Sequence, residues 1–528
     1  MSNSTQRTSF GIIGMLAAFA VGCGPPRTVP VARTWVVART PPAFDPHGPA
    51  DPVRDVLMRL TGRGLVRLDS LGDWQLDAAE SLVVSSDGLE LRFHLRADLR
   101  FQDGSRCSSQ TFARALEQGL SRTDHGTVRW ALASLAGAAR IRPGRPLPEL
   151  GIRTPDDRTL ILRLTTVDSL LPLRLAQPSI GTAWREDPTR PNWGIGLGDY
   201  AVRELEPTRW MLVRQSSESD PRSGLSHDGL RPVDTLRVRF LLGAGRVRAA
   251  LRAGTADFVW PVPAELMQQP LPEGYRVERA TTRPSRRLLL VARADVRPTW
   301  KLEARQALAH GFARSEALAR LQSWGRAEAT WLPDADVFDA PSYDRLAVQS
   351  WLNRGRFGRS LHAAMAFDAD GPAALVAPAL QQEWAQLGLD IELLPMRAAT
   401  FERERLTGSR AALLLVEHQA PLASAAAELA TYVTPATGGA IGTFRSGWRT
   451  HEFDRWLAPG AVQEAYEVQI AQDRLAEERV VAPIATLDWL WIERPDRDLR
   501  GLDPHFGPLG GTPRARAPKS SGLDAGSR

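Results

Sequence analysis

Two adjacent polar side chains, Glu417 and His418, follow the apolar run Leu413–Val416 and offer the plainest ligand chemistry in the second half of the chain. Glu417 provides a carboxylate, and His418 provides an imidazole that can bind a polar ligand or a metal ion. The alternative is a surface loop that ends a buried strand and binds nothing. Both interpretations require a strand before the pair.

Catalytic motifs are missing from the sequence. It contains no HExxH, GxSxG, P-loop or CxxC spacing, and its nine histidines show no zinc spacing. The glycine-rich run 194–198 is followed by the strand-like Tyr200–Val202 rather than by a helix, which argues against a phosphate loop. We therefore predict a protein that is not an enzyme, with no catalytic residue, no metal and no cofactor.

Residues 79–104 predict a strand with turns at both ends. Leu89, Leu91, Phe93 and Leu95 alternate with charged or polar residues, which gives one buried and one solvated face. Asp-Gly pairs stand before and after the strand, as tight turns favour. Helical periodicity predicts four helices, at 53–60, 111–120, 302–321 and 374–387. A strand is predicted after the last helix, at 391–393.

Composition is that of a large globular protein. The chain has 528 residues, 43% of them hydrophobic, which is enough for several domains with their own cores. Its formal net charge is +6. All but two of the basic residues are arginines, and they are interspersed with acids rather than massed on one helix. This pattern argues against a nucleic-acid partner.

The N-terminus predicts export. An apolar run from Phe10 to Val21 follows Arg7 and is too short to span a bilayer permanently, which suits a signal-peptide core in residues 1–22. The small residues before Cys23 resemble a bacterial lipobox, although Ala20 stands where leucine is more usual. This resemblance implies lipidation at Cys23, whereas the alternative is an ordinary signal peptide followed by a chance cysteine. Cys107 is then the only other cysteine, so no intramolecular disulfide is possible.

In residue identity, residues 79–104 resemble the signature of family 5 extracytoplasmic solute-binding proteins, which are the dipeptide, oligopeptide and nickel receptors of ABC importers. Further segments are similar to motifs of that family, in the same order along the chain, and together they span most of residues 35–500. These segments are Phe44–His47, Gly64–Val66, Phe101–Gly104, Gly196–Tyr200, Leu251–Asp257, Arg305–Leu308 and Ala471–Ile492.

The resemblance implies an α/β, two-lobed periplasmic-binding-protein-like fold (type II, cluster C) with an inserted subdomain and a ligand cleft between the lobes. Closure about two hinge crossings, near Thr282 and Pro483, would bury the ligand. The implied division gives a first lobe of three pieces, an inserted subdomain, a second lobe and a disordered tail at 507–528. Its boundaries are 24–47, 180–283 and 483–528 for the first lobe, 48–179 for the inserted subdomain and 284–482 for the second lobe.

The same resemblance suggests where ligand would bind. An edge at Arg39–Phe44, including Thr40, Ala43 and Phe44, would pair with a peptide backbone, although Pro41 and Pro42 donate no hydrogen bonds. Trp130 falls near a family aromatic that covers the ligand, and a core position is the alternative. The remaining candidates fall near the family's second-lobe ligand loop, where Trp448 would cover a ligand and Arg445 would pair with a carboxylate: Phe444, Arg445 and Trp448.

One departure bears on specificity. Several peptide-binding relatives carry an aspartate near Leu413–Pro421 that holds the ligand's α-amino group, because a buried ammonium needs a compensating charge. This chain has no aspartate there, and Glu417 is the nearest substitute. The resemblance thus implies a monomeric, lipid-anchored extracytoplasmic protein that captures a small polar ligand, most simply a peptide, and delivers it to ABC permease subunits. The alternative is a membrane-tethered sensor with the same fold and no role in transport.

Overall fold

The computed structural model describes the chain from Val31 to Arg497 with internal gaps. The described residues are 31–39, 41, 47, 51–68, 73–121, 126–142, 145–186, 194–215, 233–280, 286–321, 324–327, 330–332, 342–357, 360–408, 410–419, 425–433, 444–457 and 464–497. Residues 1–22, expected to be a signal peptide, lie outside them, as do Cys23, Thr40, Ala43, Phe44, Thr282 and residues 507–528.

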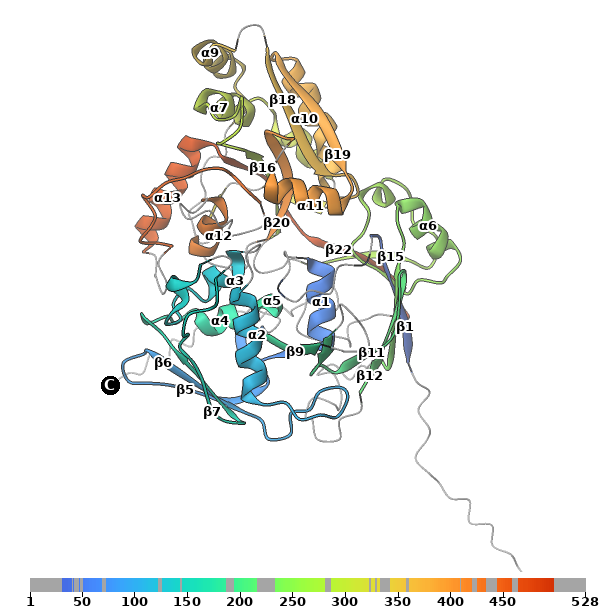
Figure 1. The fold of residues 1–528 in the computed structure, drawn as a ribbon. Helices are drawn as coiled ribbons and strands as arrows, with labels where there is room; N and C mark the ends of the chain where they lie inside the picture. The colour runs from blue at the N-terminus through green and yellow to red at the C-terminus, as the bar shows by residue number, and fades with distance from the viewer. Residues whose placement is uncertain are drawn as a thin grey trace, which may run out of the picture.

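The first lobe is built on a seven-stranded sheet whose strands come from distant parts of the chain (Figure 1). In spatial order they are β11 (Tyr200–Glu206), β12 (Arg209–Arg214), β13 (Thr235–Phe240), β1 (Ala32–Val37), β14 (Phe258–Val259), β22 (Trp489–Glu493) and β15 (Arg276–Ala280). One face packs on α1 (Pro52–Thr61) through an aromatic-rich core that includes Trp35 and Trp260. Helix α6 (Ala244–Arg252) and the short η2 (Ala264–Gln268) belong to the other side. Helix α1, expected in the inserted subdomain, therefore packs with the first lobe.

The inserted subdomain contains a four-stranded antiparallel sheet in the order β5 (Ala79–Val84), β6 (Glu90–Leu95), β8 (Thr159–Arg163) and β7 (Ile152–Asp156). The predicted strand is confirmed, because Leu91, Phe93 and Leu95 of β6 are buried in this core. The remaining elements of this region are short strands and helices: β2 (Arg63–Gly64), β3 (Val66–Leu68), β4 (Trp74–Leu76), α2 (Ser109–Ser121), α3 (Gly126–Ala131), η1 (Ala138–Arg140), α4 (Leu171–Leu175), α5 (Pro178–Gly181), β9 (Thr182–Glu186) and β10 (Gly194–Gly196). Strands β9 and β10 were expected in the first lobe, but they form a sheet with β2 and so lie with the inserted subdomain.

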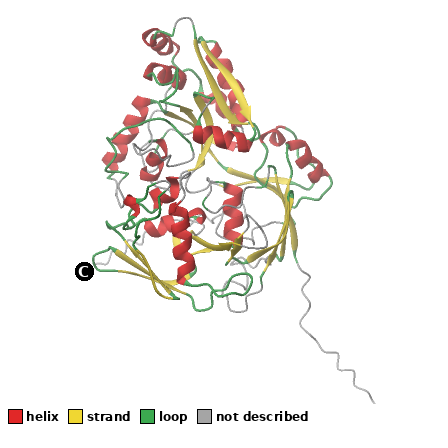
Figure 2. Ribbon diagram, in the orientation of Figure 1, coloured by secondary structure: helices red, strands yellow, loops and turns green. Residues whose placement is uncertain are grey.

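The second lobe contains a six-stranded mixed sheet with helices against both faces (Figure 2). Its strands are β17 (Gly325–Ala327), β21 (Val481–Leu487), β16 (Arg286–Ala292), β20 (Leu413–Gln419), β18 (Leu361–Asp368) and β19 (Leu389–Met396). Helices α7 (Leu302–His310), α8 (Arg314–Leu321), α9 (Arg345–Gly355) and α10 (Ala373–Ala385) contribute to the core on one face. Helices α11 (Ala398–Thr407), α12 (Ala425–Tyr432) and α13 (Ala465–Glu478) contribute to the core on the other.

The single helix expected over 302–321 is instead two helices. Helix α7 ends at His310, and Gly311 follows at its C-cap. A Cβ at Gly311 would lie 2.8 Å from both the Ala307 carbonyl oxygen and Trp384 Cδ1, so only glycine fits where the chain turns beneath α10. Side-chain periodicity continues across this break, which is why the sequence pattern alone missed it.

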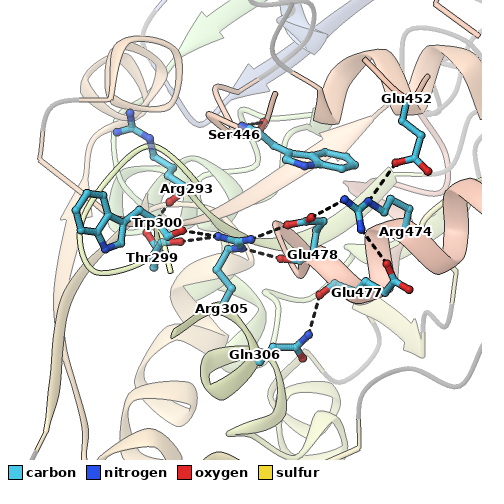
Figure 3. Close-up of polar contacts among 11 residues, drawn as sticks. Arg293, Thr299, Trp300, Arg305, Gln306, Ser446, Glu452, Arg474, Glu477 and Glu478 are labelled. Atoms are coloured by element: carbon cyan, nitrogen blue, oxygen red, sulfur yellow. Dashed lines mark hydrogen bonds and ion pairs between the residues drawn. The ribbon is translucent and has the colours of Figure 1, made fainter. Parts of the chain in front are cut away.

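A polar network fastens α7 to α13 across the second lobe (Figure 3). Arg305 donates to the Glu478 carboxylate at 2.8 Å and to the Glu478 backbone oxygen at 2.6 Å. Arg474 on α13 pairs with the same carboxylate at 3.1 Å and with Glu452 at 3.2 Å. Because Arg305 is buried, these bonds compensate the loss of its hydration.

The chain crosses between the two large sheets at Asp488. Strand β21 pairs with β16 in the second-lobe sheet as far as Leu487, and Trp489 begins β22 in the first-lobe sheet. The boundary expected at Pro483 therefore moves to Asp488, because Pro483 lies within β21 opposite Leu289. The other crossing joins β15 to β16 through residues outside the described part. No helix among the described residues is long and apolar enough to cross a bilayer.

Candidate ligand cleft

A cavity of about 120 Å³ lies where the two lobes meet. The first lobe contributes Ala38, Arg39, Pro52, Trp260, Pro261, Val262, Pro263, Trp489 and Leu490, and the second contributes Arg286, Trp324, Asp368, Asp370, Gly371, Pro372, Ala398 and Glu417. Its walls come from the carboxyl ends of strands that run parallel in each sheet, β1 beside β14 and β18 beside β20. Open α/β sheets bind ligands at this edge.

Aromatic side chains form the first-lobe wall. The Trp260 ring lies 5.9 Å from Trp35 and 4.9 Å from Trp489, centroid to centroid. Trp35 Nε1 donates to the Trp260 carbonyl oxygen at 2.7 Å, which fixes the loop that follows β14. Beside this wall Arg39 pairs with Asp51 at 2.5 Å. The wall is thus held in place by its own contacts.

Glu417 faces this cavity and already has a cationic partner. Strands β16 and β20 are antiparallel, and Leu288 stands opposite Glu417, so Arg286 lies two residues along on the same face. The Arg286 guanidinium forms an ion pair with the Glu417 carboxylate. The Arg286 Cζ atom also lies 4.8 Å from the centre of the Trp489 ring, a cation–π contact that reaches into the first lobe.

His418 points to the opposite face of the sheet and is buried there. Its Nε2 lies 3.2 Å from Glu428 Oε2, and Arg287 donates to Glu428 Oε1 at 3.0 Å. The Tyr432 hydroxyl also bonds the Glu428 carboxylate. Burial acts to raise the pKa of Glu428, but the charges of His418 and Arg287 outweigh it and lower that pKa to about 2. The structure therefore separates the expected Glu417–His418 pair, because successive strand residues face opposite ways.

Two further carboxylates follow β18 at the cavity. Asp368 ends the strand and accepts a hydrogen bond from the Asp370 backbone N–H at 3.1 Å. Burial raises the pKa of Asp368 to about 6, and the nearby Glu417 and Asp370 charges add to the rise, whereas Arg39 opposes it. The lining of the cavity therefore contains three carboxylates and two guanidinium groups. The excess of negative charge favours a cation.

The two lobes already touch beside these carboxylates. The backbone N–H of Ala264, in the first lobe, donates to the Asp370 carbonyl oxygen at 3.1 Å. A Cβ on Gly371 would collide with Glu417 Oε1, so the absence of a side chain there leaves room for the Glu417 carboxylate. The loop after β18 thus both contacts the first lobe and makes room for the Glu417 carboxylate.

Four other candidate residues lie away from this cavity. Phe444 is 1% exposed and packs in the core against Tyr432, with ring centres 6.1 Å apart. Trp448 is also buried, and Arg445 pairs with Asp295 at 2.9 Å. Trp130 is partly buried at the inserted subdomain's core, with Arg174 Cζ 5.5 Å from its ring centre. Among the described candidates, the structure brings only Glu417 to the cavity.

Arg39, the first residue of the edge expected to pair with a peptide backbone, lines the cavity, whereas sequence reasoning missed Arg286, Asp368, Trp260 and Trp489. One signal was available for Asp368: the segment Phe367-Asp368-Ala369-Asp370-Gly371 ends an apolar stretch with acids and glycine, as a strand's carboxyl end does. Among the described residues, no three histidine, cysteine or acidic side chains gather in a way that would hold a metal ion.

Known proteins resemble this chain in sequence and in fold. The family model for bacterial extracellular solute-binding proteins, family 5, matches residues 73–440. A glutathione-binding protein GsiB of Escherichia coli O1:K1 is 22% identical over 275 residues, 50% of this chain and 48% of the relative. The match thus spans about half the length of that curated relative. The periplasmic oligopeptide-binding protein OppA of Haemophilus influenzae is 31% identical over 177 residues, 31% of this chain and 32% of that protein.

Solved structures share the fold of this protein along nearly the whole chain. The Haemophilus influenzae OppA complex with the peptide RPPGFSPFR has a TM-score of 0.73 at 17% identity and covers 91% of this chain and 98% of its own. The protein AgaA of A. tumefaciens R10, in complex with agropinic acid, has a TM-score of 0.72 at 19% identity, with 88% and 93% covered. These structures share the two-lobed α/β fold, and their proteins are binding proteins rather than enzymes. This chain belongs to the bacterial extracellular solute-binding proteins of family 5.

Proposed function

We infer that this protein is an extracytoplasmic, lipid-anchored receptor that captures a small polar ligand, most simply a peptide, and delivers it to the permease subunits of an ABC importer. The family and the two-lobed fold support a binding role. The observation that carries the proposal is the cavity between the lobes, which has walls from both of them and an excess of carboxylates.

The charges of this cavity suggest how a ligand would be oriented. Glu417 is neutralised by Arg286, whereas only a backbone hydrogen bond from Asp370 and the more distant charge of Arg39 act against the burial of Asp368. An ammonium group of the ligand would compensate Asp368 and end the cost of an unpaired carboxylate. We therefore assign the ligand's cationic group to Asp368 and Asp370, on a different strand from the segment in which peptide-binding relatives place their aspartate.

The size of the cavity implies that the lobes separate to admit ligand. Its volume is about 120 Å³. Small-molecule sites commonly measure roughly 300–1,000 Å³. Rotation about the crossings at Asp488 and between β15 and β16 would widen the space between the walls without altering either sheet. In this proposal the ligand is enclosed by contacts from both lobes.

Membrane attachment in the proposal depends on Cys23. The residue would become the acylated N-terminus of the mature chain after removal of residues 1–22. Intact-mass analysis of the protein expressed in a bacterial host tests this step: the wild-type chain should carry the mass of a lipid and Cys23→Ser should not. If the two masses differ only by the change from cysteine to serine, the proposed lipid anchor is wrong.

Ligand capture is tested by native mass spectrometry of the mature protein and then by calorimetry with the peptides that co-purify. Asp368→Asn should weaken binding by about 30-fold or more, since it removes one partner of an enclosed charge pair. Glu206→Gln, which alters an exposed acid outside the cavity, is the matched control and should bind normally. Equal affinity for amino-acetylated and free peptides would refute the cationic contact, and failure to bind any peptide would refute the ligand class.

A further inference from the structure

A second hollow, of about 650 Å³, lies at strands β1, β12 and β13 of the first-lobe sheet and is rich in arginine. Its charged lining comprises Arg209, Arg237, Arg239, Arg497, Glu204 and Asp257. Gly254 and Thr255, which follow helix α6 along the chain, also border it. None of its lining residues belongs to the cavity between the lobes.

The strand register concentrates positive charge on this face. Arg209 of β12 stands directly opposite Arg239 of β13, and Arg237 lies two residues away on the same side. Like charges at directly opposed positions destabilise a sheet. An anion between these guanidinium groups would relieve their repulsion.

The acids nearby pair with Arg209 and Arg497, and the lining keeps a net positive charge, with four arginines to two acids. Asp257 is buried, and its carboxylate accepts from the Thr34 backbone N–H at 2.8 Å and pairs with Arg497 at 3.3 Å. Arg209 pairs with Glu206 at 2.8 Å, and Arg239 donates to the Thr255 hydroxyl, a neutral group, at 3.2 Å. Guanidinium groups bind phosphate through paired hydrogen bonds, so the hollow matches a phosphate group.

The position of the hollow indicates the source of that phosphate. Ala32 and Thr34, at the start of β1, line it. Ala32 follows Cys23 by nine residues. Even a fully extended connection of that length reaches only about 30 Å. A chain anchored at Cys23 therefore keeps this face within a short distance of the membrane surface.

We propose that the hollow lined by Arg209, Arg237 and Arg239 binds the phosphates of anionic lipid headgroups and so holds the first lobe against the membrane that carries the anchor. The choice of a lipid over a free phosphate rests on the lipid anchor of the proposed function, whereas the affinity for phosphate rests on the arginine geometry alone. Anionic surfaces attract juxtamembrane basic residues, and this attraction weakens as salt is added.

The test uses the chain from residue 24 without a lipid, which retains every described element because the first of them begins at Ala32. Co-sedimentation measures its binding to vesicles of phosphatidylcholine with or without phosphatidylglycerol. We expect binding only to the anionic vesicles, with a loss of about five-fold for each arginine removed in Arg237→Gln and Arg239→Gln. Circular dichroism melting checks that the variants fold.

The matched control is the double variant Arg92→Gln and Arg163→Gln, which removes the same charge from exposed positions of the inserted subdomain. It should bind anionic vesicles like the parent chain. An equal loss in the control, no binding to anionic vesicles, or arginine-dependent binding of inorganic phosphate without vesicle binding would each overturn the proposal. Because the tested chain has no anchor, these results are independent of whether Cys23 is acylated or a peptide binds the cleft.

Discussion

The two faces of the β16–β20 ladder carry similar charges in opposite surroundings. On the cavity face Arg286 pairs with Glu417, and the two side chains are 12% and 27% exposed. On the other face Arg287, His418 and Glu428 form a cluster in which Arg287 is 6% and Glu428 2% exposed. Burial makes the inner cluster a structural requirement, because a lone charge there cannot be hydrated. The outer pair has room to exchange partners.

The largest expected difference is in stability. Glu428→Gln leaves Arg287 without a buried counter-charge and should lower the free energy of unfolding by about 3–5 kcal/mol. Glu417→Gln alters a pair at the cavity wall and should cost at most about 1 kcal/mol. Urea unfolding monitored by circular dichroism measures both. Equal losses in the two variants would show that the two faces do not differ in the way described.

The pH dependence of stability sharpens the contrast, because the acids of the two faces have shifts of opposite sign. The lowered pKa of Glu428, about 2, stabilises the folded state above pH 4.5, and this contribution disappears as the pH falls toward 2. The raised pKa of Asp368, about 6, destabilises the folded state as the pH rises from 3.8 through 6.

Asp368→Asn should therefore stabilise the protein at neutral pH. We expect a gain of up to about 3 kcal/mol above pH 6 and none below about pH 4. Urea unfolding of the two proteins across this pH range gives the comparison. A gain that does not change with pH would mean that the substitution acts through packing rather than through the charge of Asp368.

The smallest expected effect concerns Gly371, against which the Glu417 carboxylate rests. Gly371→Ala should cost less than about 1 kcal/mol, because the atom it meets is the end of a flexible side chain. The cost should vanish in a Glu417→Ala background, which a double-mutant cycle measures. An undiminished cost in that background would place its origin in the backbone of the loop.

Local patterns predicted much of the fold. The alternation around β6 and the periodicity of α1, α2 and α10 each arise within one segment, and the structure contains all four. The break at Gly311 escaped prediction because it depends on Trp384, a residue of a different helix. The strand crossing at Asp488 likewise depends on which sheet accepts each hydrogen bond.

The site was harder to predict than the fold. The apolar run before Glu417 and His418 is buried on both faces, so it gave no alternation from which to separate the two residues. Arg286 meets Glu417 across 131 positions of sequence, and Trp489 joins them from another sheet. Such neighbours are set by topology, which residue types alone do not specify.

Arg286 is also an intramolecular competitor. Because it is part of the chain, it contends with any ligand cation for Glu417 at a local concentration that dilution cannot lower. In a receptor of the proposed kind, a ligand ammonium group that reaches Glu417 must displace the Arg286 guanidinium. When the ligand leaves, the guanidinium pairs with Glu417 again. Release then leaves Glu417 paired rather than bare, which favours a receptor that exchanges its cargo over one that retains it.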